Sequence, residues 1–275
     1  MPAVKLHATE ELAGYLTMPR TIWCPGCSNG TVLRAMLDAV LSLGLDREKV
    51  AVVAGIGCSG RIVQYLDFST VHTPHGRALA VASGAKIADP DLHVIVVMGD
   101  GDCTAIGGNH LIHAARRNID LTAVVFNNSI YGMTGGQMSP TTFLGDRSTT
   151  SVYGNIEQAF DVCELAKAAG ATYVARGTAY DYRRLTRCLA GGIRHQGFSL
   201  VEAIVACPTY YGRQNGEADP LKMLLRQRDR AVPIEKRQGD GPRQQDSYPV
   251  GVLHHVERAE YTAAYEGVIA NACGR

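Results

Sequence analysis

Four of the eight cysteines in this sequence stand where metal binding or thiol chemistry would use them. Cys24 and Cys27 form a Cys-x-x-Cys motif at the start of a predicted helix, where the helix dipole and free amides stabilise thiolates. Cys58 lies in a glycine-rich loop after a predicted strand, and Cys207 ends another strand before Pro208. Because the carboxyl ends of parallel strands share one edge of a sheet, we expect the four thiols to converge. Such a set can hold zinc or an iron-sulfur cluster, and the spacing alone does not choose between them.

The remaining cysteines have simpler interpretations. Cys163 and Cys188 fall within helical patterns, Cys103 follows an acidic motif, and Cys273 is near the end of the sequence. We expect these four to be small buried or incidental residues.

Acidic and amide side chains follow two further predicted strands. A Gly-Asp-Gly-Asp sequence that contains Asp100 comes directly after the apolar run 93–98, and Asn127-Asn128 ends the run 121–126. A strand, a crossover helix and a neighbouring strand fit the interval between Asp100 and Asn128, so both side chains reach the same sheet edge. Carboxylate and amide oxygens suit Mg²⁺ that bridges phosphates, and the glycines allow backbone amides to face phosphate oxygens.

These residues must be positioned by an alternation of strands and helices. Continuous Val/Ile-rich runs separated by helical patterns predict a mostly parallel sheet covered on both faces, which is a doubly wound, three-layer α/β/α fold. The expected strands are 50–54, 93–98, 121–126, 172–175 and 199–206. The expected helices are 32–41, 78–88, 108–117, 157–170 and 182–195.

Composition excludes several classes of function. The 275 residues carry a net charge of +1 with mixed signs along the chain, so we expect no nucleic-acid or membrane partner held by electrostatics. No apolar run approaches the roughly 20 residues of a spanning helix. The first 20 residues lack the features of a secretory or transit peptide. We therefore expect a cytoplasmic protein whose cysteines are not paired in disulfides.

The C-terminal part differs in composition. Between Arg226 and Arg243 basic residues outnumber acidic ones, and Gly239, Gly241 and Pro242 oppose regular structure. Two interpretations remain open for this excursion, which precedes a short closing segment at 250–272. It is either a solvated tail, the simpler interpretation, or a contact surface for another subunit.

Six motifs occur in order along the chain: Trp23–Cys27, Gly55–Gly60, His75–Arg77, Gly99–Asp102, Asn127–Gln137 and Cys207–Thr209. Together they resemble the β subunits of 2-oxoacid:ferredoxin oxidoreductases, which bind thiamine diphosphate (TPP). The resemblance implies a domain that binds TPP and an iron-sulfur cluster at 22–213. It leaves an N-terminal segment (1–21) and a C-terminal extension (214–275), for which we expect a contact with another subunit.

The resemblance implies a role for each matching residue. Cys24, Cys27, Cys58 and Cys207 match the ligands of one [4Fe-4S] cluster. Asp100, Asn128 and the backbone carbonyl of Ile130 match ligands of Mg²⁺. The positions that match contacts to TPP are Ile56, Gly57, Cys58, Ser59, His75, Gly101, Asp102, Gly132 and Met133.

The implied activity is coenzyme A-dependent oxidative decarboxylation of a 2-oxoacid, with electrons leaving through the cluster to ferredoxin; the reaction is reversible as reductive carboxylation. Activation of TPP needs a carboxylate, and none of Glu157, Glu164 and Glu202 lies in a cofactor motif. We therefore expect the α subunit to supply it, in an αβ unit or its dimer, and this chain alone to be inactive.

The substrate is predicted less directly. The segments 132–142, 153–157 and 168–176 look most like members specific for 2-oxoglutarate, although some of those carry a lysine where this sequence has Gly135. Branched-chain 2-oxoacids and pyruvate are alternatives. A non-redox TPP decarboxylase subunit with structural zinc and a thiol-exchange module built on Cys24 and Cys27 are the competing classes.

Overall fold

One mixed sheet organises the protein. The computed structural model describes residues 4–236 and 247–274, and in that part of the chain eight strands follow the order β2-β1-β3-β4-β6-β5-β8-β7. Neighbouring strands from β2 to β5 are parallel, as the apolar runs predicted. The strands of this parallel part are β1 (Val50–Ala54), β2 (Ser69–His72), β3 (His93–Gly99), β4 (Thr122–Asn127), β5 (Tyr173–Thr178) and β6 (Ser199–Ile204).

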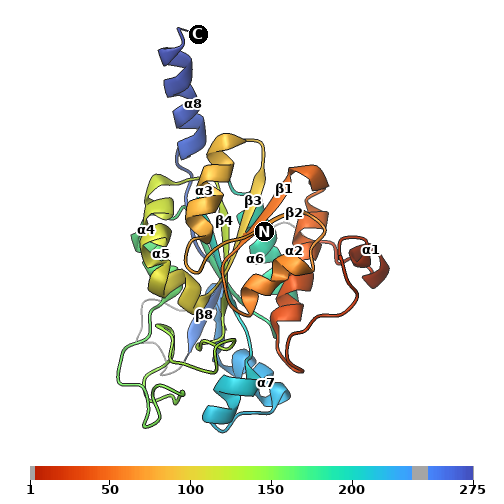
Figure 1. Cartoon of the computed structure of the whole chain (residues 1–275), viewed down its shortest axis with the longest axis vertical. Helices are drawn as coiled ribbons and strands as arrows, with labels where there is room; N and C mark the ends of the chain where they lie inside the picture. Colours follow the sequence, from red (N-terminus) through yellow and green to blue (C-terminus); the bar gives the residue numbers. More distant parts are fainter. Residues whose placement is uncertain (1–3, 237–246, 275) are drawn as a thin grey trace.

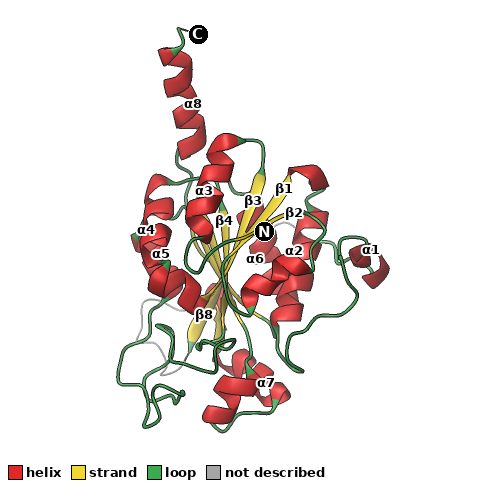
Figure 2. Ribbon diagram, viewed as in Figure 1, coloured by secondary structure: helices red, strands yellow, loops and turns green. Residues whose placement is uncertain are grey.

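Helices cover both faces of this sheet, which confirms the three-layer α/β/α prediction (Figures 1 and 2). Successive strand residues alternate between the two layers: Val52 and Val124 pack on one side, and Val53 and Val125 on the other. The first layer contains α2 (Asn29–Ser42) and α6 (Tyr182–Arg194); the second contains α3 (Ala78–Ala88), α4 (Gly108–Arg117) and α5 (Val162–Ala168).

One strand and one helix differ from what the sequence predicted. Strand β2 was not predicted because its four residues are exposed at the sheet edge and form no apolar run. Helix α5 begins at Val162 instead of 157, because the Asp161 carboxylate accepts hydrogen bonds from the backbone N–H groups of Cys163 and Glu164 and caps the helix there.

The described part of the basic excursion, residues 226–236, forms helix and strand, so its interpretation as a solvated tail is wrong there. Strand β8 (Tyr248–His255) pairs antiparallel with β5, and β7 (Ala231–Pro233) pairs with β8. Pro249 and Gly251 interrupt the apolar pattern of β8, which hid this strand from sequence analysis. The predicted break at Gly239, Gly241 and Pro242 lies outside the described residues.

The two helices of the extension lie at opposite ends of the molecule. Helix α7 (Pro220–Arg230) lies at the carboxyl ends of the parallel strands, whereas α8 (Tyr261–Ala272) projects beyond their amino ends (Figure 1). No helix in the described residues is long and apolar enough to span a membrane. Short helical elements complete the chain: α1 (Thr9–Ala13), η1 (Arg47–Lys49), η2 (Ser59–Gln64), η3 (Asp102–Ile106), η4 (Pro208–Gly212) and η5 (Ile234–Lys236).

Candidate functional site

A cavity of about 220 Å³ opens at the carboxyl ends of β1, β3 and β4. Every residue that sequence analysis assigned to TPP or Mg²⁺ lines it, although these residues come from four separate segments of the chain. They are Ile56, Gly57, Cys58, Ser59, His75, Asp100, Gly101, Asp102, Asn128, Ile130, Gly132 and Met133. The predicted convergence at one sheet edge is therefore present in the structure.

Asp100 is held in one orientation at the floor of this cavity. Its Oδ2 atom accepts hydrogen bonds from the hydroxyl groups of Ser139, at 2.6 Å, and Thr141, at 2.5 Å. The side chain is buried, and burial raises the pKa of its carboxyl group to about 6. A buried carboxylate oriented by two neutral hydroxyl donors favours a cationic ligand, because no Lys or Arg among the described residues forms an ion pair with it.

The two asparagines form a turn next to Asp100. The Oδ1 atom of Asn127 accepts a hydrogen bond from the Ser129 backbone N–H at 3.0 Å, and Asn128 Oδ1 accepts one from Ile130 N–H at 3.2 Å. Ser129 has a positive φ of 58°, and its carbonyl accepts a hydrogen bond from Thr142 Oγ1 at 2.7 Å. These bonds bring Asn128 and Ile130 to the cavity wall.

Asp102 joins three walls of the cavity. Its Oδ1 atom accepts hydrogen bonds from Gly76 N–H at 2.7 Å and Ile56 N–H at 3.4 Å, and it lies 2.5 Å from His75 Nδ1. A Cβ atom on Gly55 would lie 1.7 Å from Asp102 Oδ2, so only glycine fits there. The carboxylate of Asp102 thus organises the loops that form the cavity.

The predicted cysteine ligands lie beside the same cavity. The Trp23 indole Nε1 donates to the Cys58 carbonyl oxygen at 2.6 Å and ties the Cys-x-x-Cys motif to the loop after β1. An added Cβ on Gly132 would lie 3.5 Å from Cys58 Sγ and 3.7 Å from Cys207 Sγ. Sulfur atoms from two separate segments therefore border the loop that contains Gly132.

Ser28 connects the Cys-x-x-Cys motif to Cys207. Its hydroxyl does not cap α2 but accepts a hydrogen bond from the Ala206 backbone N–H at 2.9 Å. Gly26 between the two motif cysteines has φ of 77°, and a Cβ there would lie 2.2 Å from Pro220 of α7. The C-terminal extension thus packs directly on the motif.

Three thiols of this group, those of Cys27, Cys58 and Cys207, resist ionisation. Burial raises the pKa of Cys27 to about 12; a bond from Asn29 N–H opposes this effect, and the neighbouring thiols add to it. Burial also raises the pKa of Cys58 and of Cys207. Within residues 4–236 and 247–274, no group of three or more His, Cys, Asp or Glu side chains is arranged to hold a single metal ion.

The other cysteines are placed as the sequence suggested. Cys103, Cys163 and Cys188 are buried, and Cys273 is exposed at the C-terminal end of α8.

Several site residues escaped sequence analysis. Asn29 lines the cavity, is 2% exposed, and its Oδ1 has no hydrogen-bond partner. Tyr131 packs so closely on Gly101 that a Cβ would lie 2.3 Å from its ring. Ser139 and Thr141 bond to Asp100 across about 40 positions. Asn29 had a visible signal, its place two residues after Cys27, but the two hydroxyl residues had none.

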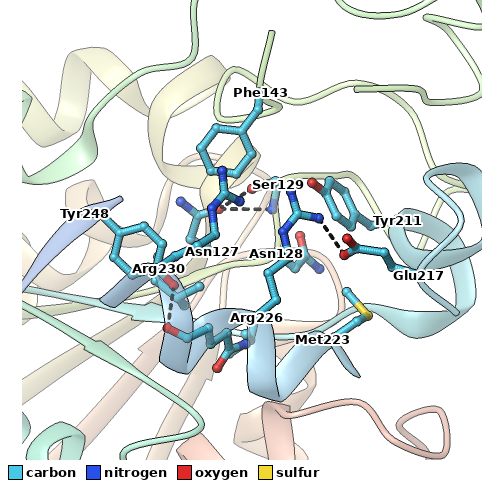
Figure 3. Close-up of a pocket in the computed structure, with 13 residues that line it drawn as sticks. Asn127, Asn128, Ser129, Phe143, Tyr211, Glu217, Met223, Arg226, Arg230 and Tyr248 are labelled. Carbon is cyan, nitrogen blue, oxygen red and sulfur yellow. Dashed lines mark hydrogen bonds and ion pairs between the residues drawn. The ribbon is translucent and has the colours of Figure 1, made fainter. Parts of the chain in front are cut away.

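A second cavity, of about 70 Å³, lies behind the asparagine turn (Figure 3). Arg226 on its wall pairs with Glu217 at 2.5 Å, and the Arg230 guanidinium lies 4.7 Å from the centre of the Phe143 ring. Much of the basic charge of α7 is therefore engaged within the protein.

Comparison with known proteins agrees with this geometry. The family described as "Thiamine pyrophosphate enzyme, C-terminal TPP binding domain" matches residues 55–203. The chain is 58% identical over 224 residues to the "2-oxoglutarate synthase subunit KorB" of Archaeoglobus fulgidus, covering 80% of this chain and 83% of that protein. It is 44% identical over 255 residues to the protein of that name from Methanothermobacter marburgensis, covering 92% of this chain and 90% of the relative.

A solved structure extends the similarity across the whole fold. A chain of the "2-oxoglutarate:ferredoxin oxidoreductase from Magnetococcus marinus with 2-oxoglutarate, coenzyme A and succinyl-CoA bound" matches with a TM-score of 0.86 and 32% identity, covering 99% of this chain and 94% of that one. The fold, the cavity and the sequence similarity lead to one conclusion. This chain belongs to the family of TPP-binding β subunits of 2-oxoacid:ferredoxin oxidoreductases.

Proposed function

We propose that this chain is the β subunit of a 2-oxoglutarate:ferredoxin oxidoreductase that converts 2-oxoglutarate and coenzyme A to succinyl-CoA and CO₂. In this proposal the chain binds TPP, Mg²⁺ and a [4Fe-4S] cluster, and ferredoxin accepts the electrons. The single observation that carries the proposal is the shared cavity, which is lined by every residue assigned to TPP or Mg²⁺.

The cavity suits a TPP diphosphate bound through Mg²⁺. Asp100, Asn128 and the Ile130 carbonyl would supply oxygen ligands to the metal, which matches the preference of Mg²⁺. The unpartnered Oδ1 of Asn29 is a buried acceptor that a bound ligand would satisfy. TPP, when bound, supplies the electron sink for decarboxylation, while the protein orients the reacting groups and excludes water.

The thiols of Cys24, Cys27, Cys58 and Cys207 suit an iron-sulfur cluster. Burial disfavours free thiolates at Cys27, Cys58 and Cys207, so a bound cation would be needed to stabilise them. A four-iron cluster is wider than one ion, and its ligands need not approach a single point. The position of Cys58 on the cavity wall would keep the electron path from TPP short.

The activating carboxylate would come from the α subunit. No glutamate belongs to the described lining of the cavity. Glu202 is buried in an ion pair with Arg176, and Glu157 and Glu164 are exposed. The α subunit would also supply a cation for the distal carboxylate of 2-oxoglutarate, because no lysine or arginine lines the described cavity.

Relatives favour 2-oxoglutarate over other 2-oxoacids. Both the archaeal relatives and the Magnetococcus enzyme are named for this substrate. Other relatives are named only as 2-oxoacid:ferredoxin oxidoreductases, so branched-chain 2-oxoacids and pyruvate remain the alternatives within the same chemistry.

The test is anaerobic co-expression with the α subunit. We expect brown protein with four iron and four sulfide per chain, and coenzyme A-dependent ferredoxin reduction that is fastest with 2-oxoglutarate among 2-oxoglutarate, pyruvate and 2-oxoisovalerate. Colourless protein with one zinc would favour the non-redox alternative. Turnover by the isolated chain would contradict the proposed role of the α subunit.

A further inference from the structure

We propose that Glu202, held by Arg176, is a positioning residue for the Mg²⁺ site and acts through Asn127. The proposal rests on the function proposed above and adds a role for buried charges that lie outside the TPP cavity. It connects strands β4, β5 and β6 to the asparagine turn through consecutive side-chain hydrogen bonds.

The first link is a buried ion pair between neighbouring strands. Glu202 on β6 and Arg176 on β5 are register partners and are 2% and 4% exposed. The Arg176 Nε atom donates to Glu202 Oε2, which also accepts a bond from Cys163 Sγ at 3.4 Å. Asp161 accepts a second bond from Arg176, at 2.5 Å. Arg176 and Cys163 thus fix the Glu202 carboxylate, and Asp161 fixes Arg176.

The second link fixes the amide of Asn127. Its Nδ2 atom donates to Glu202 Oε1 at 2.7 Å. An ionised carboxylate can only accept hydrogen bonds, so the nitrogen must face Glu202 and the oxygen must face the turn. Asn127 Oδ1 there accepts a bond from Ser129 N–H at 3.0 Å, and Thr141 Oγ1 lies 3.1 Å from it. Figure 3 shows the bonds that join Asn127 to Ser129.

The third link reaches the proposed metal ligands. Ser129 lies between Asn128 and Ile130, so its bond to Asn127 holds the backbone that carries both. The Thr141 hydroxyl has one hydrogen, which it donates to Asp100 Oδ2 at 2.5 Å, so Thr141 meets Asn127 Oδ1 by contact only. Glu202 therefore acts through a single amide on the turn that carries two proposed Mg²⁺ ligands, and that amide also contacts the hydroxyl that orients the third.

Stability alone does not account for this arrangement. A buried ion pair pays a large desolvation cost and is often replaceable by apolar residues without loss of stability. Here the Arg176–Glu202 pair fixes the Asn127 amide, which holds the turn that carries the proposed Mg²⁺ ligands. Partners of metal ligands commonly orient them in this way. Glu202 does not line the TPP cavity, which also excludes it as the activating carboxylate.

The decisive variant is Asn127→Ala, which removes the connecting amide and leaves the Arg176–Glu202 pair in place. The dissociation constant of Mn²⁺, an EPR-visible probe for the Mg²⁺ site, is measured in the αβ complex with saturating TPP. We expect it to rise by roughly 10–100-fold, the usual effect of losing an outer-shell partner. An unchanged constant would overturn the proposal.

A double-mutant cycle tests whether Glu202 acts on the metal site through Asn127, which we call the relay, or whether the substitutions simply disturb the fold. We expect Glu202→Gln to weaken Mn²⁺ binding, and Glu202→Gln combined with Asn127→Ala to be no weaker than Asn127→Ala alone, because Glu202 acts through that amide. Additive losses would contradict the relay. If Glu202→Gln does not fold, Glu202→Asp, which keeps the charge but draws the carboxylate back from Asn127, takes its place in the cycle with the same expected outcomes.

Lys86→Met is the matched control. Lys86 is buried and pairs with Asp120 at 2.7 Å, but it lies at the amino end of the sheet and has no bond to the turn. We expect lower thermal stability with an unchanged Mn²⁺ constant. Wild-type complex that binds neither Mn²⁺ nor TPP would reject the proposed function itself, whereas wild-type binding with unaffected variants would reject only the relay.

Discussion

The two ends of the sheet use buried asparagines in opposite ways. At the amino end, Asn118 ends α4 with φ of 54° and all of its amide is engaged within the protein. Its Oδ1 accepts bonds from Thr172 Oγ1 at 2.7 Å and Phe198 N–H at 2.9 Å. Its Nδ2 donates to the carbonyls of Arg258 and Ala259 at 3.2 and 3.1 Å. This amide joins the C-terminal extension to the parallel strands.

At the carboxyl end, the asparagines border a cavity. Among the described residues, Asn29 Oδ1 has no hydrogen-bond partner, and the Asn128 side chain bonds only locally, to Ile130 N–H. Asn127 alone is tied to the interior, through Glu202. The same side-chain chemistry thus closes the fold at one end and leaves acceptors for a ligand at the other.

This difference shows how one sheet can separate stability from function. A fully bonded amide stabilises the fold because hydrogen bonds within the protein replace those that it loses to water on burial. A buried amide whose oxygen has no partner costs stability unless a ligand supplies the missing hydrogen bond, and this is the pattern expected of a binding site. Substitutions at the carboxyl end should therefore reduce ligand binding, whereas substitutions at the amino end should reduce stability.

The largest effect is expected for Asp100→Ala at the carboxyl end. Removal of the only carboxylate in the proposed Mg²⁺ ligand set should reduce turnover by more than the roughly 100-fold loss typical of outer-shell changes. TPP binding, measured by calorimetry on the αβ complex with Mg²⁺, should weaken in parallel. Because the buried carboxyl has a raised pKa, the fold should tolerate its removal, and normal TPP affinity would contradict the metal assignment.

Cys207→Ser should uncouple electron transfer from cofactor binding. Loss of one proposed ligand should abolish the brown colour and ferredoxin reduction, while Mg²⁺-dependent TPP binding stays within a fewfold of wild type. Cys188→Ser is the matched control, because Cys188 is buried in α6 and belongs to neither site. A control that loses iron, or a Cys207 variant that keeps four iron, would contradict the division of the cysteines.

Asn118→Ala tests the amino end. It removes four hydrogen bonds and places alanine at a positive φ, so we expect the free energy of local unfolding to fall by about 2–4 kcal/mol. Hydrogen exchange of β5 amides in the αβ complex measures this change. Asn118→Gly separates the two causes, since glycine tolerates positive φ. The Mn²⁺ dissociation constant should stay within twofold of wild type.

The sequence predicted the parts of the molecule that depend on local patterns. Continuous apolar runs located β1 and β3, and the ordered motifs brought Asp100 and Asn128 to one edge, because strand direction alone dictates that convergence. The partners of Asp100 could not be predicted in this way. Ser139 and Thr141 reach it through a loop of irregular structure, and no periodic pattern encodes such contacts.

The C-terminal extension was misread for a related physical reason. Strand β8 lies between β5 and the edge strand β7 and carries Pro249 and Gly251, so burial of residues such as Val250 depends on tertiary contacts with β5 and not on local propensity. Its basic residues likewise suggested a free patch, but Arg226 bonds to Glu217. Charge counts along the chain do not reveal such pairing.

The smallest predicted effect is a pH dependence at the amino end. Burial, followed by the nearby His255, lowers the pKa of His195 below its ordinary value of 6.5, against opposing effects of Asp120 and Glu257. The unfolded chain therefore takes up the proton first, so this contribution to stability is present above about pH 6.5 and is lost as the pH falls below it. We expect His195→Gln, which can still bond to Thr172, to flatten the decline in hydrogen-exchange protection of β5 between pH 7.5 and 5.5, roughly the range in which histidine titrates. His113→Gln on the exposed face of α4 should keep the wild-type slope. An equally steep decline in the His195 variant would assign the acid sensitivity to other groups, and the contrast between the two ends would then rest on their asparagines alone.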